Sequence, residues 1–475
     1  MSQRLRPRDV AFLSAETSTT PMHNATVEVF EPGDSGFDYD RLLELISDRL
    51  SFVPRYRQRI RFVPGHLANP EWVDDADFDL AYHVRRSALP RPGSREQLLE
   101  LAARIVSRPL DRHRPLWEVY VIEGLENGHV ALLTKTHLAL VDGVDSVDLG
   151  QVLLDLKAEQ ETIGGDSWRP PRPPTPLSLV ASAVTDSARD PKVLGATVRS
   201  NAAGAIRRAR AAADQATRIV GALTNQQPAP ESPFLGPLSQ QRRVIGVMTD
   251  LAAYRKVREA HGGSVNDVIL ATIAGGLRGW LMTRAESLSG IRQVRTVVPV
   301  SVIDESAEAT AVGQIKAHWV DLPIGEASPV VRLHQVSYSF QAHKETGRGV
   351  AANRLAGIAG FAPVTFHAIG VRVAAAELRR GFSLNVTNVP GPQSPLHAAG
   401  AQMIETYPVP PLLPGHALAI GVTSYRGQVF YGITADRDLL PDADVLASCL
   451  VEALDELVDT AGSGRPKIPR GRRKR

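Results

Sequence analysis

One segment of this sequence, KTHLALVDGVDS at residues 135–146, combines a histidine with an Asp-Gly pair five residues later. The pattern predicts a β-strand that ends in a sharp Asp-Gly turn and is followed by a helix. His137 carries the imidazole of this segment, and imidazole is the side chain that gains or loses a proton near neutral pH. Gly143 permits a tight backbone turn, and Asp142 can pair with a cation or cap the following helix.

The sequence lacks the patterns of several other reactive sites. Its thirteen histidines are scattered, and no His-x-x-x-His pair predicts a metal site on a helix. It has neither a GxxxxGK[ST] loop nor a GxGxxG loop, which argues against nucleotide hydrolysis and Rossmann-type binding. The single cysteine, Cys449, cannot form a disulfide within the chain and suits a reducing cytoplasm. We therefore expect neither a metal nor a cofactor.

Strands and helices alternate in both parts of the chain, which favours an α/β or α+β fold. In the first part the predicted strands are 25–31, 117–123 and 129–140, and the predicted helices are 40–61, 95–107 and 144–158. In the second part the strands are 242–251, 294–302, 382–392 and a hairpin at 416–436, and the helices are 264–284, 326–347, 349–379 and 442–461.

The 475 residues are too many for one hydrophobic core, so at least two lobes are expected. Pro-rich breaks at 164–176 and 226–237 enclose an Ala-rich, Arg-rich stretch. We predict a first lobe at 1–163, a helical crossover at 164–237, a second lobe at 238–462 and a basic tail at 463–475. No run of 18 apolar residues and no secretory h-region is present, so any membrane contact is expected to be peripheral.

Several segments resemble the bacterial wax ester synthase/diacylglycerol acyltransferase family. Besides residues 135–146 and the 416–436 hairpin, they are DVAFLSAET (9–17), PMHNATVEVFEP (21–32), EWVDDADFDLAYHVRR (71–86), RPLWEVYVIEGL (114–125), SVNDVILATIAGGLRGWL (264–281), VVPVSV (297–302) and NVTNVPGPQSPLH (385–397). The resemblance implies two chloramphenicol-acetyltransferase-like lobes with a tunnel between them. It also implies transfer of a fatty acyl group from acyl-CoA, as substrate, to diacylglycerol or a long-chain alcohol.

Position 138 departs from the motif of that family. The superfamily has His-His-x-x-x-Asp-Gly, in which the second histidine is the general base and the aspartate orients the site. Here His137 occupies the first position, Leu138 the second, and Asp142 and Gly143 the last two. Neighbouring side chains of a strand point to opposite faces, so we expect Leu138 to face the tunnel and His137 to face away. A one-residue bulge would turn His137 inward and make it the candidate base.

Two pairs of polar residues have both a structural and a functional interpretation. Asn266 and Asp267 lie in the first turn of a predicted helix, where polar residues cap the free N–H groups. Asn385 and Asn388 lie on a predicted strand that runs into a turn. The alternative for both pairs is that they line the tunnel beside Leu138 and bind substrate.

The charge is unevenly distributed along the chain. Residues 465–475 hold seven cations and no acid, so the remainder is mildly acidic although the net charge is +3. Such a tail binds an anionic lipid surface or nucleic acid, or is simply solvated. Nucleic acid is disfavoured because the acidic body offers no matching basic surface. We expect a cytoplasmic protein that associates peripherally with the inner face of the plasma membrane.

Two functions are compatible with these observations. The first is an acyltransferase that makes triacylglycerol or wax esters with weakened activity, because loss of a general base typically lowers a rate by about 10²–10⁴-fold. The second is an inactive paralogue that binds acyl-CoA or lipid. The residue at position 138 discriminates between them, since leucine cannot accept a proton.

Overall fold

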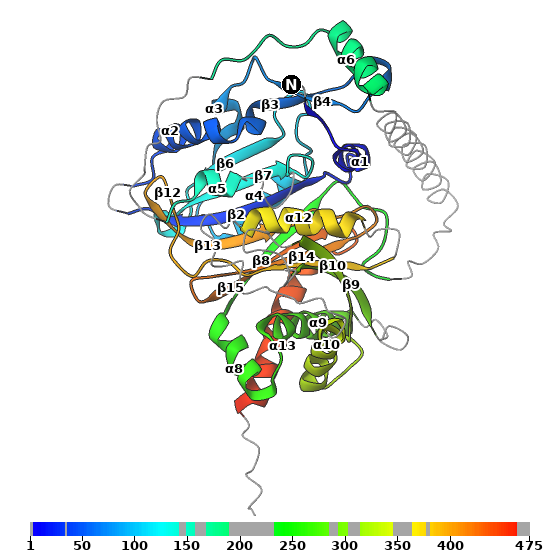
Figure 1. The fold of residues 1–475 in the computed structure, drawn as a ribbon. Helices are drawn as coiled ribbons and strands as arrows, with labels where there is room; N and C mark the ends of the chain where they lie inside the picture. Colours follow the sequence, from blue (N-terminus) through cyan, green and yellow to red (C-terminus); the bar gives the residue numbers. More distant parts are fainter. Residues whose placement is uncertain are drawn as a thin grey trace, which may run out of the picture.

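The computed structural model consists of two lobes, each built around a six-stranded sheet, with helix α12 between them (Figure 1). It describes residues 3–33, 36–141, 149–156, 168–189, 232–284, 293–302, 314–344, 363–376 and 381–462. The expectation of a two-lobed α/β fold is confirmed. We call the lobe that contains β2 the first lobe and the lobe that contains β14 the second lobe.

The sheet of the first lobe is mostly antiparallel. Its order is β12 (His397–Ala398), β13 (Ala401–Val409), β2 (His23–Glu31), β7 (Val130–His137), β6 (Trp117–Glu123) and β5 (Val84–Ala88). A small separate sheet has the order β1 (Gln3–Arg4), β4 (Glu71–Asp74) and β3 (Gln58–Arg61). The register of β2 with β7 runs from His23 opposite His137 to Phe30 opposite Val130 without a shift.

The sheet of the second lobe is mixed. Its order is β10 (Gln314–Leu322), β9 (Val294–Val302), β11 (Leu384–Val389), β14 (Leu418–Tyr425), β15 (Gln428–Asp436) and β8 (Arg242–Asp250). Strand β11 lies parallel to both β9 and β14. The hairpin predicted at 416–436 is confirmed; it turns at Arg426 and Gly427, and both residues have positive φ angles, 45° and 79°.

Residues from the C-terminal part of the chain complete the first lobe. Strand β13 pairs with β2 from Gln402 opposite Glu31 to Val409 opposite Ala25. Residues 397–409 therefore belong to the first sheet, whereas the sequence-based boundaries place them in the second lobe. Only tertiary pairing decides this, because the alternating pattern of β13 is compatible with either sheet.

Helices pack on both sheets, and α4 and α12 contact both lobes. They are α1 (Pro7–Ala15), α2 (Tyr39–Arg49), α3 (Leu80–His83), α4 (Arg95–Val106), α5 (Leu149–Leu153), α6 (Pro176–Arg189), α8 (Leu251–His261), α9 (Val265–Thr283), α10 (Pro329–Lys344), α12 (Pro363–Ala376) and α13 (Ala443–Gly462). Each lobe has its own apolar core, and a third apolar cluster lies between the lobes around α12.

Two predicted elements end earlier than the sequence pattern suggested. The helix predicted for 40–61 ends at Arg49, and single turns and strand β3 follow, because Pro54 cannot donate a helical hydrogen bond. The strand predicted for 129–140 ends at His137, after which Leu140 N–H turns back to the His137 carbonyl. Most of the predicted crossover and the basic tail lie outside the described residues.

Candidate active site

The end of strand β7 keeps the strand alternation that the sequence predicts. His137 N–H donates to Leu116 O at 3.0 Å, and Leu138 N–H donates to Met22 O at 2.9 Å. Because β7 pairs with β2 and β6 without a bulge, His137 keeps the strand orientation of Lys135. Lys135 Nζ donates to carbonyls at the end of α4, so this face of the sheet is the α4 face.

His137 is a buried histidine whose Nδ1 is hydrogen-bonded and whose Nε2 faces a carboxylate without a hydrogen bond. Nδ1 accepts a hydrogen bond from Ala139 N–H at 3.0 Å, so in the neutral ring the proton resides on Nε2. Nε2 lies 3.7 Å from Glu16 Oε2, a charge contact slightly beyond hydrogen-bonding distance. With no exposed surface and no free lone pair, this imidazole is poorly placed to accept a proton from a substrate.

Glu16, which follows α1, ties His137 to the loop after α4. Arg112 Nε donates to Glu16 Oε2 at 2.8 Å, and Arg112 Nη2 donates to the same oxygen at 2.5 Å. Burial alone would raise the pKa of Glu16, but His137 and Arg112 outweigh it and lower that pKa to about 2. The carboxylate therefore stays ionised and holds the two cationic or polar partners together.

Leu138 lies in the apolar cluster between the lobes. It has no exposed surface, and its cluster includes Phe12 of α1, Val297 of β9 and Val371 of α12. The side chains of positions 137 and 138 thus occupy different environments, one polar and one apolar. No group in this cluster can serve as a proton acceptor in place of Leu138.

Arg372 of α12 connects the second half of the chain to this motif through hydrogen bonds and an ion pair. Its guanidinium donates to Leu138 O at 2.5 Å and also to Val141 O and Asp9 Oδ1. The ion pair with Asp9 is almost fully buried on both sides. Asp142 and Gly143, which the resemblance assigns to the site, lie outside the described residues.

Asn266 and Asp267 occupy the first turn of α9. Asp267 forms a capping box with Ser264, whose N–H donates to Asp267 Oδ2 at 2.8 Å. Ser337 donates a further hydrogen bond to Asp267 Oδ2 at 3.1 Å. Asp267 therefore caps the start of α9, and its Oδ2 accepts both of these hydrogen bonds.

The two asparagines of β11 have different surroundings. Asn388 Nδ2 donates to Asn266 Oδ1 at 2.8 Å, which links β11 to the start of α9. Asn385 is three residues earlier and therefore points to the opposite face. It is 1% exposed, and neither its Oδ1 nor its Nδ2 has a hydrogen-bond partner among the described residues.

The sequence analysis missed His367, which lies on α12. It is 1% exposed, and its Nδ1 lies 2.7 Å from Thr387 Oγ1. Its Nε2 has no partner among the described residues, and burial lowers the pKa of the ring to about 3. An unpaired buried polar atom costs about 1–3 kcal/mol and calls for an explanation. The feature of the sequence that could have identified it is a lone histidine in the apolar run PVTFHAIGVRVAAA.

A groove of about 940 Å³ lies between α4 of the first lobe and β8 of the second. Six of the residues that line it are arginines and three are acids. Arg95 is paired with Glu405, whereas among the described residues no acid pairs with Arg104, Arg108 or Arg437. The walls also include apolar side chains, among them Leu99 and Val244.

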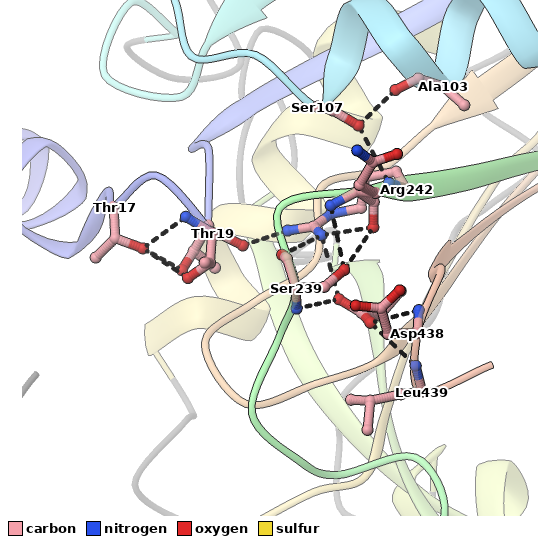
Figure 2. Close-up of polar contacts among 11 residues, drawn as sticks. Thr17, Thr19, Ala103, Ser107, Ser239, Arg242, Asp438 and Leu439 are labelled. Carbon is pink, nitrogen blue, oxygen red and sulfur yellow. Dashed lines mark hydrogen bonds and ion pairs between the residues drawn. The ribbon is translucent and has the colours of Figure 1, made fainter. Parts of the chain in front are cut away.

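Arg242 fixes the inner wall of this groove by linking the lobes. Figure 2 shows its guanidinium between Thr19 of the first lobe and Ser239 of the second. Its Nη1 lies 3.3 Å from Asp436 Oδ2, and its backbone N–H donates to Ser107 Oγ at 3.1 Å. Both members of the Arg242–Asp436 ion pair are buried and hydrogen-bonded, and they hold this inner wall of the groove in place.

None of the helices in the described residues is both long enough and apolar enough to cross a membrane.

Comparison with known proteins gives matches along most of the chain. A family model for the wax ester synthase/diacylglycerol acyltransferase catalytic domain matches residues 5–269, and a model for the WS/DGAT C-terminal domain matches residues 313–458. The probable diacyglycerol O-acyltransferase tgs1 of Mycobacterium tuberculosis is 35% identical over 436 residues, which cover 92% of this chain and 91% of the relative. The probable diacyglycerol O-acyltransferase tgs2 of the same species is 32% identical, covering 96% and 99%.

A solved structure has the same architecture. The wax ester synthase/diacylglycerol acyltransferase from Marinobacter aquaeolei VT8 is 27% identical, with a TM-score of 0.66. The alignment covers 97% of this chain and 100% of that one. Both lobes are therefore matched in sequence and in structure, and the chain belongs to the wax ester synthase/diacylglycerol acyltransferase family.

Proposed function

We propose that this protein is an O-acyltransferase that moves a fatty acyl group from acyl-CoA to diacylglycerol or a long-chain alcohol. The products are triacylglycerol or a wax ester. Family membership supports this assignment, because the relatives named above are diacylglycerol acyltransferases and a wax ester synthase. The observation that carries it in the structure is the arginine-lined groove between the lobes.

The groove has the chemistry that coenzyme A requires. Coenzyme A carries a pyrophosphate and a 3′-phosphate, and arginine binds phosphate oxygens with paired N–H donors. Arg104, Arg108 and Arg437 line the groove, and no acid among the described residues neutralises them. The volume of the groove is within the range of small-molecule sites.

Acyl transfer is tested with purified protein, radiolabelled palmitoyl-CoA and diacylglycerol or hexadecanol. We expect slow formation of labelled triacylglycerol or wax ester. The double variant Arg104→Glu/Arg108→Glu should raise KM for palmitoyl-CoA by about 10-fold or more, because each reversal replaces attraction to phosphate by repulsion. Arg255→Glu, on the exposed face of α8, is the matched control. An unchanged KM in the double variant argues against the groove as the coenzyme A site.

The leucine at position 138 favours a second candidate function, acyl-CoA or lipid binding without turnover. Under this alternative, palmitoyl-CoA binds with the same dependence on Arg104 and Arg108. No product forms, even when a histidine is introduced at position 138. Isothermal titration with palmitoyl-CoA, run beside the transfer assay, distinguishes the two functions.

We also propose peripheral binding to anionic lipid at the inner face of the plasma membrane. The basic residues of 465–475 support this, at about 1 kcal/mol per cation near the surface. Helix α6 adds exposed apolar side chains, with Leu177 82% and Val184 60% exposed. Co-sedimentation with phosphatidylserine vesicles should be strong and should fall with salt. Equal binding to neutral vesicles, or none to either, contradicts this proposal.

A further inference from the structure

The described part of the motif offers no general base, although the proposed reaction needs one. Leu138 cannot accept a proton, and the lone pair of His137 Nδ1 is occupied by Ala139 N–H. Among the described residues, a base must therefore come from another element. Helix α12 is the element of the second half that is bonded to this point, through Arg372 and the carbonyl of Leu138.

His367 lies on the same helix, five residues before Arg372. Five residues of α-helix span about 7.5 Å. Between them, Ala368 and Val371 pack in the same apolar cluster as Leu138. The helix that contacts the motif through Arg372 therefore also carries His367, although this helix comes from the other half of the chain.

Close packing of α12 on β11 fixes the ring of His367. Gly370 allows the approach, since a Cβ at this position would lie 3.0 Å from Thr387 Cγ2. Thr387 Oγ1 in turn lies 2.7 Å from His367 Nδ1. When Nδ1–H donates to this hydroxyl, Nε2 is left with its lone pair and no partner. This is the orientation that a proton acceptor needs.

His367 lines a narrow pocket that both lobes build. Thr26 and Glu28 come from β2, Thr406 from β13, and Thr423 from β14. The pocket has room for about one water molecule, which is the size of a hydroxyl group. Except for Glu28, the polar groups around it are uncharged, which suits the hydroxyl of an otherwise apolar molecule better than an ion.

We propose that His367 is the general base of this enzyme, replacing the histidine that the family motif carries at position 138. The inference rests on the proposed function. The acceptor hydroxyl enters the pocket, and its proton passes to Nε2 as the oxygen attacks the thioester carbonyl carbon. The tetrahedral intermediate collapses with cleavage of the C–S bond. The imidazolium returns the proton to the departing sulfur, so coenzyme A leaves as the thiol and the ester remains.

Burial affects the efficiency of this base. The pKa of His367 is lowered to about 3 by burial, so the ring is neutral at working pH and its lone pair is available. A base with so low a pKa accepts a proton less readily than one whose pKa is near 7. The proposal therefore fits a slow enzyme rather than an inactive one.

The test compares kcat and KM for four proteins: wild type, His367→Gln, Leu138→His and the double variant Leu138→His/His367→Gln. Glutamine keeps hydrogen-bonding capacity but accepts no proton. We expect His367→Gln to lower kcat by about 10²-fold or more, with KM for palmitoyl-CoA changed less than about 3-fold. The double variant should recover activity, because position 138 then supplies an imidazole. Such recovery also shows that the glutamine at position 367 leaves the fold intact.

His416→Gln is the matched control for replacing a buried histidine of the second lobe. Both of its ring nitrogens already have carbonyl partners, so kcat should stay close to the wild-type value. Wild-type kcat in His367→Gln overturns the inference and leaves the proposed function standing. An inactive wild type beside an active Leu138→His also overturns it, because the scaffold then works only with a restored motif. If neither transfers acyl groups, the proposed function itself fails.

Discussion

His137 ends β7 and His367 lies on the helix that is bonded to this strand end; both are buried, yet their surroundings differ. His137 is held on the α4 face by Ala139 N–H and by the ionised Glu16. His367 has one nitrogen on Thr387 and the other without a partner in a narrow pocket. A histidine inside a recognised motif can therefore be structural, while one outside any motif has the free nitrogen that chemistry requires.

The difference follows from which element carries each ring. Strand alternation fixes the side chain at position 137 on the face opposite position 138, and the unshifted register of β2 and β7 leaves no freedom to turn it. Helix α12 instead packs against both sheets, so one of its faces must lie between the lobes. A polar residue on that face is surrounded by both halves of the protein.

The largest expected effect comes from restoring the motif. Leu138→His should raise kcat by part of the about 10²–10⁴-fold that a well-placed general base contributes. The imidazole enters an apolar cluster, so the free energy of unfolding should fall by about 1–3 kcal/mol. Rates of triacylglycerol formation and urea unfolding measure both effects. Leu138→Met, which keeps the volume without a base, is the control; equal activity in the two variants contradicts the prediction.

A smaller effect is expected for Glu16, which should contribute to the free energy of unfolding at neutral pH but not at low pH. Its pKa is about 2 in the folded protein, below its ordinary value of 4.5, so its contribution is present above pH 4.5 and lost as the pH falls towards 2. The shift corresponds to about 3 kcal/mol. Urea unfolding between pH 5 and pH 2 should show this additional loss in wild type and not in Glu16→Gln.

Glu452→Gln on the exposed face of α13 serves as the carboxylate control for that experiment. It should follow the wild-type pH dependence, because an exposed carboxylate has no folded-state partner to lose. Identical pH dependence in wild type and Glu16→Gln would mean that the contact with His137 and Arg112 contributes nothing to folding.

The smallest expected effect on catalysis is that of His137→Ala. If this ring is structural, kcat should change by less than about 5-fold, while the free energy of unfolding falls by about 1–3 kcal/mol. Single-turnover transfer assays at a temperature well below the unfolding midpoint separate the effect on kcat from the effect on the free energy of unfolding. Abolished transfer in a folded His137→Ala protein would make His137 the base and reverse the comparison with His367.

The sequence predicted the family, the two lobes and most of the elements, because their signals are local. Strand β2, helix α4 and the hairpin at 416–436 follow from the periodicity of their residues. The capping box at Asp267 was likewise readable as a helix start. Strand alternation alone predicted that the side chains of positions 137 and 138 point to opposite faces of the sheet.

Other features depend on contacts between distant segments. The sequence of β13 does not show that it pairs with β2 rather than with its own lobe, since either sheet would bury the same face. The opposite surroundings of Asn385 and Asn388 depend on what packs on each side of β11. The ion pair of Arg372 with Asp9 joins residues 363 positions apart.

Taken alone, the sequence determined that Leu138 follows His137 and precedes Asp142 by four residues, because identity and spacing are properties of the chain itself. It could not determine that the helix bonded to the end of β7 also carries His367, with Thr387 on one ring nitrogen and none of the described residues on the other. That arrangement exists only once α12 packs between the two sheets. The hydrogen bond at Nδ1 distinguishes the two rings in the folded protein: the Nδ1 of His137 accepts from Ala139 N–H, whereas that of His367 can donate to Thr387 Oγ1.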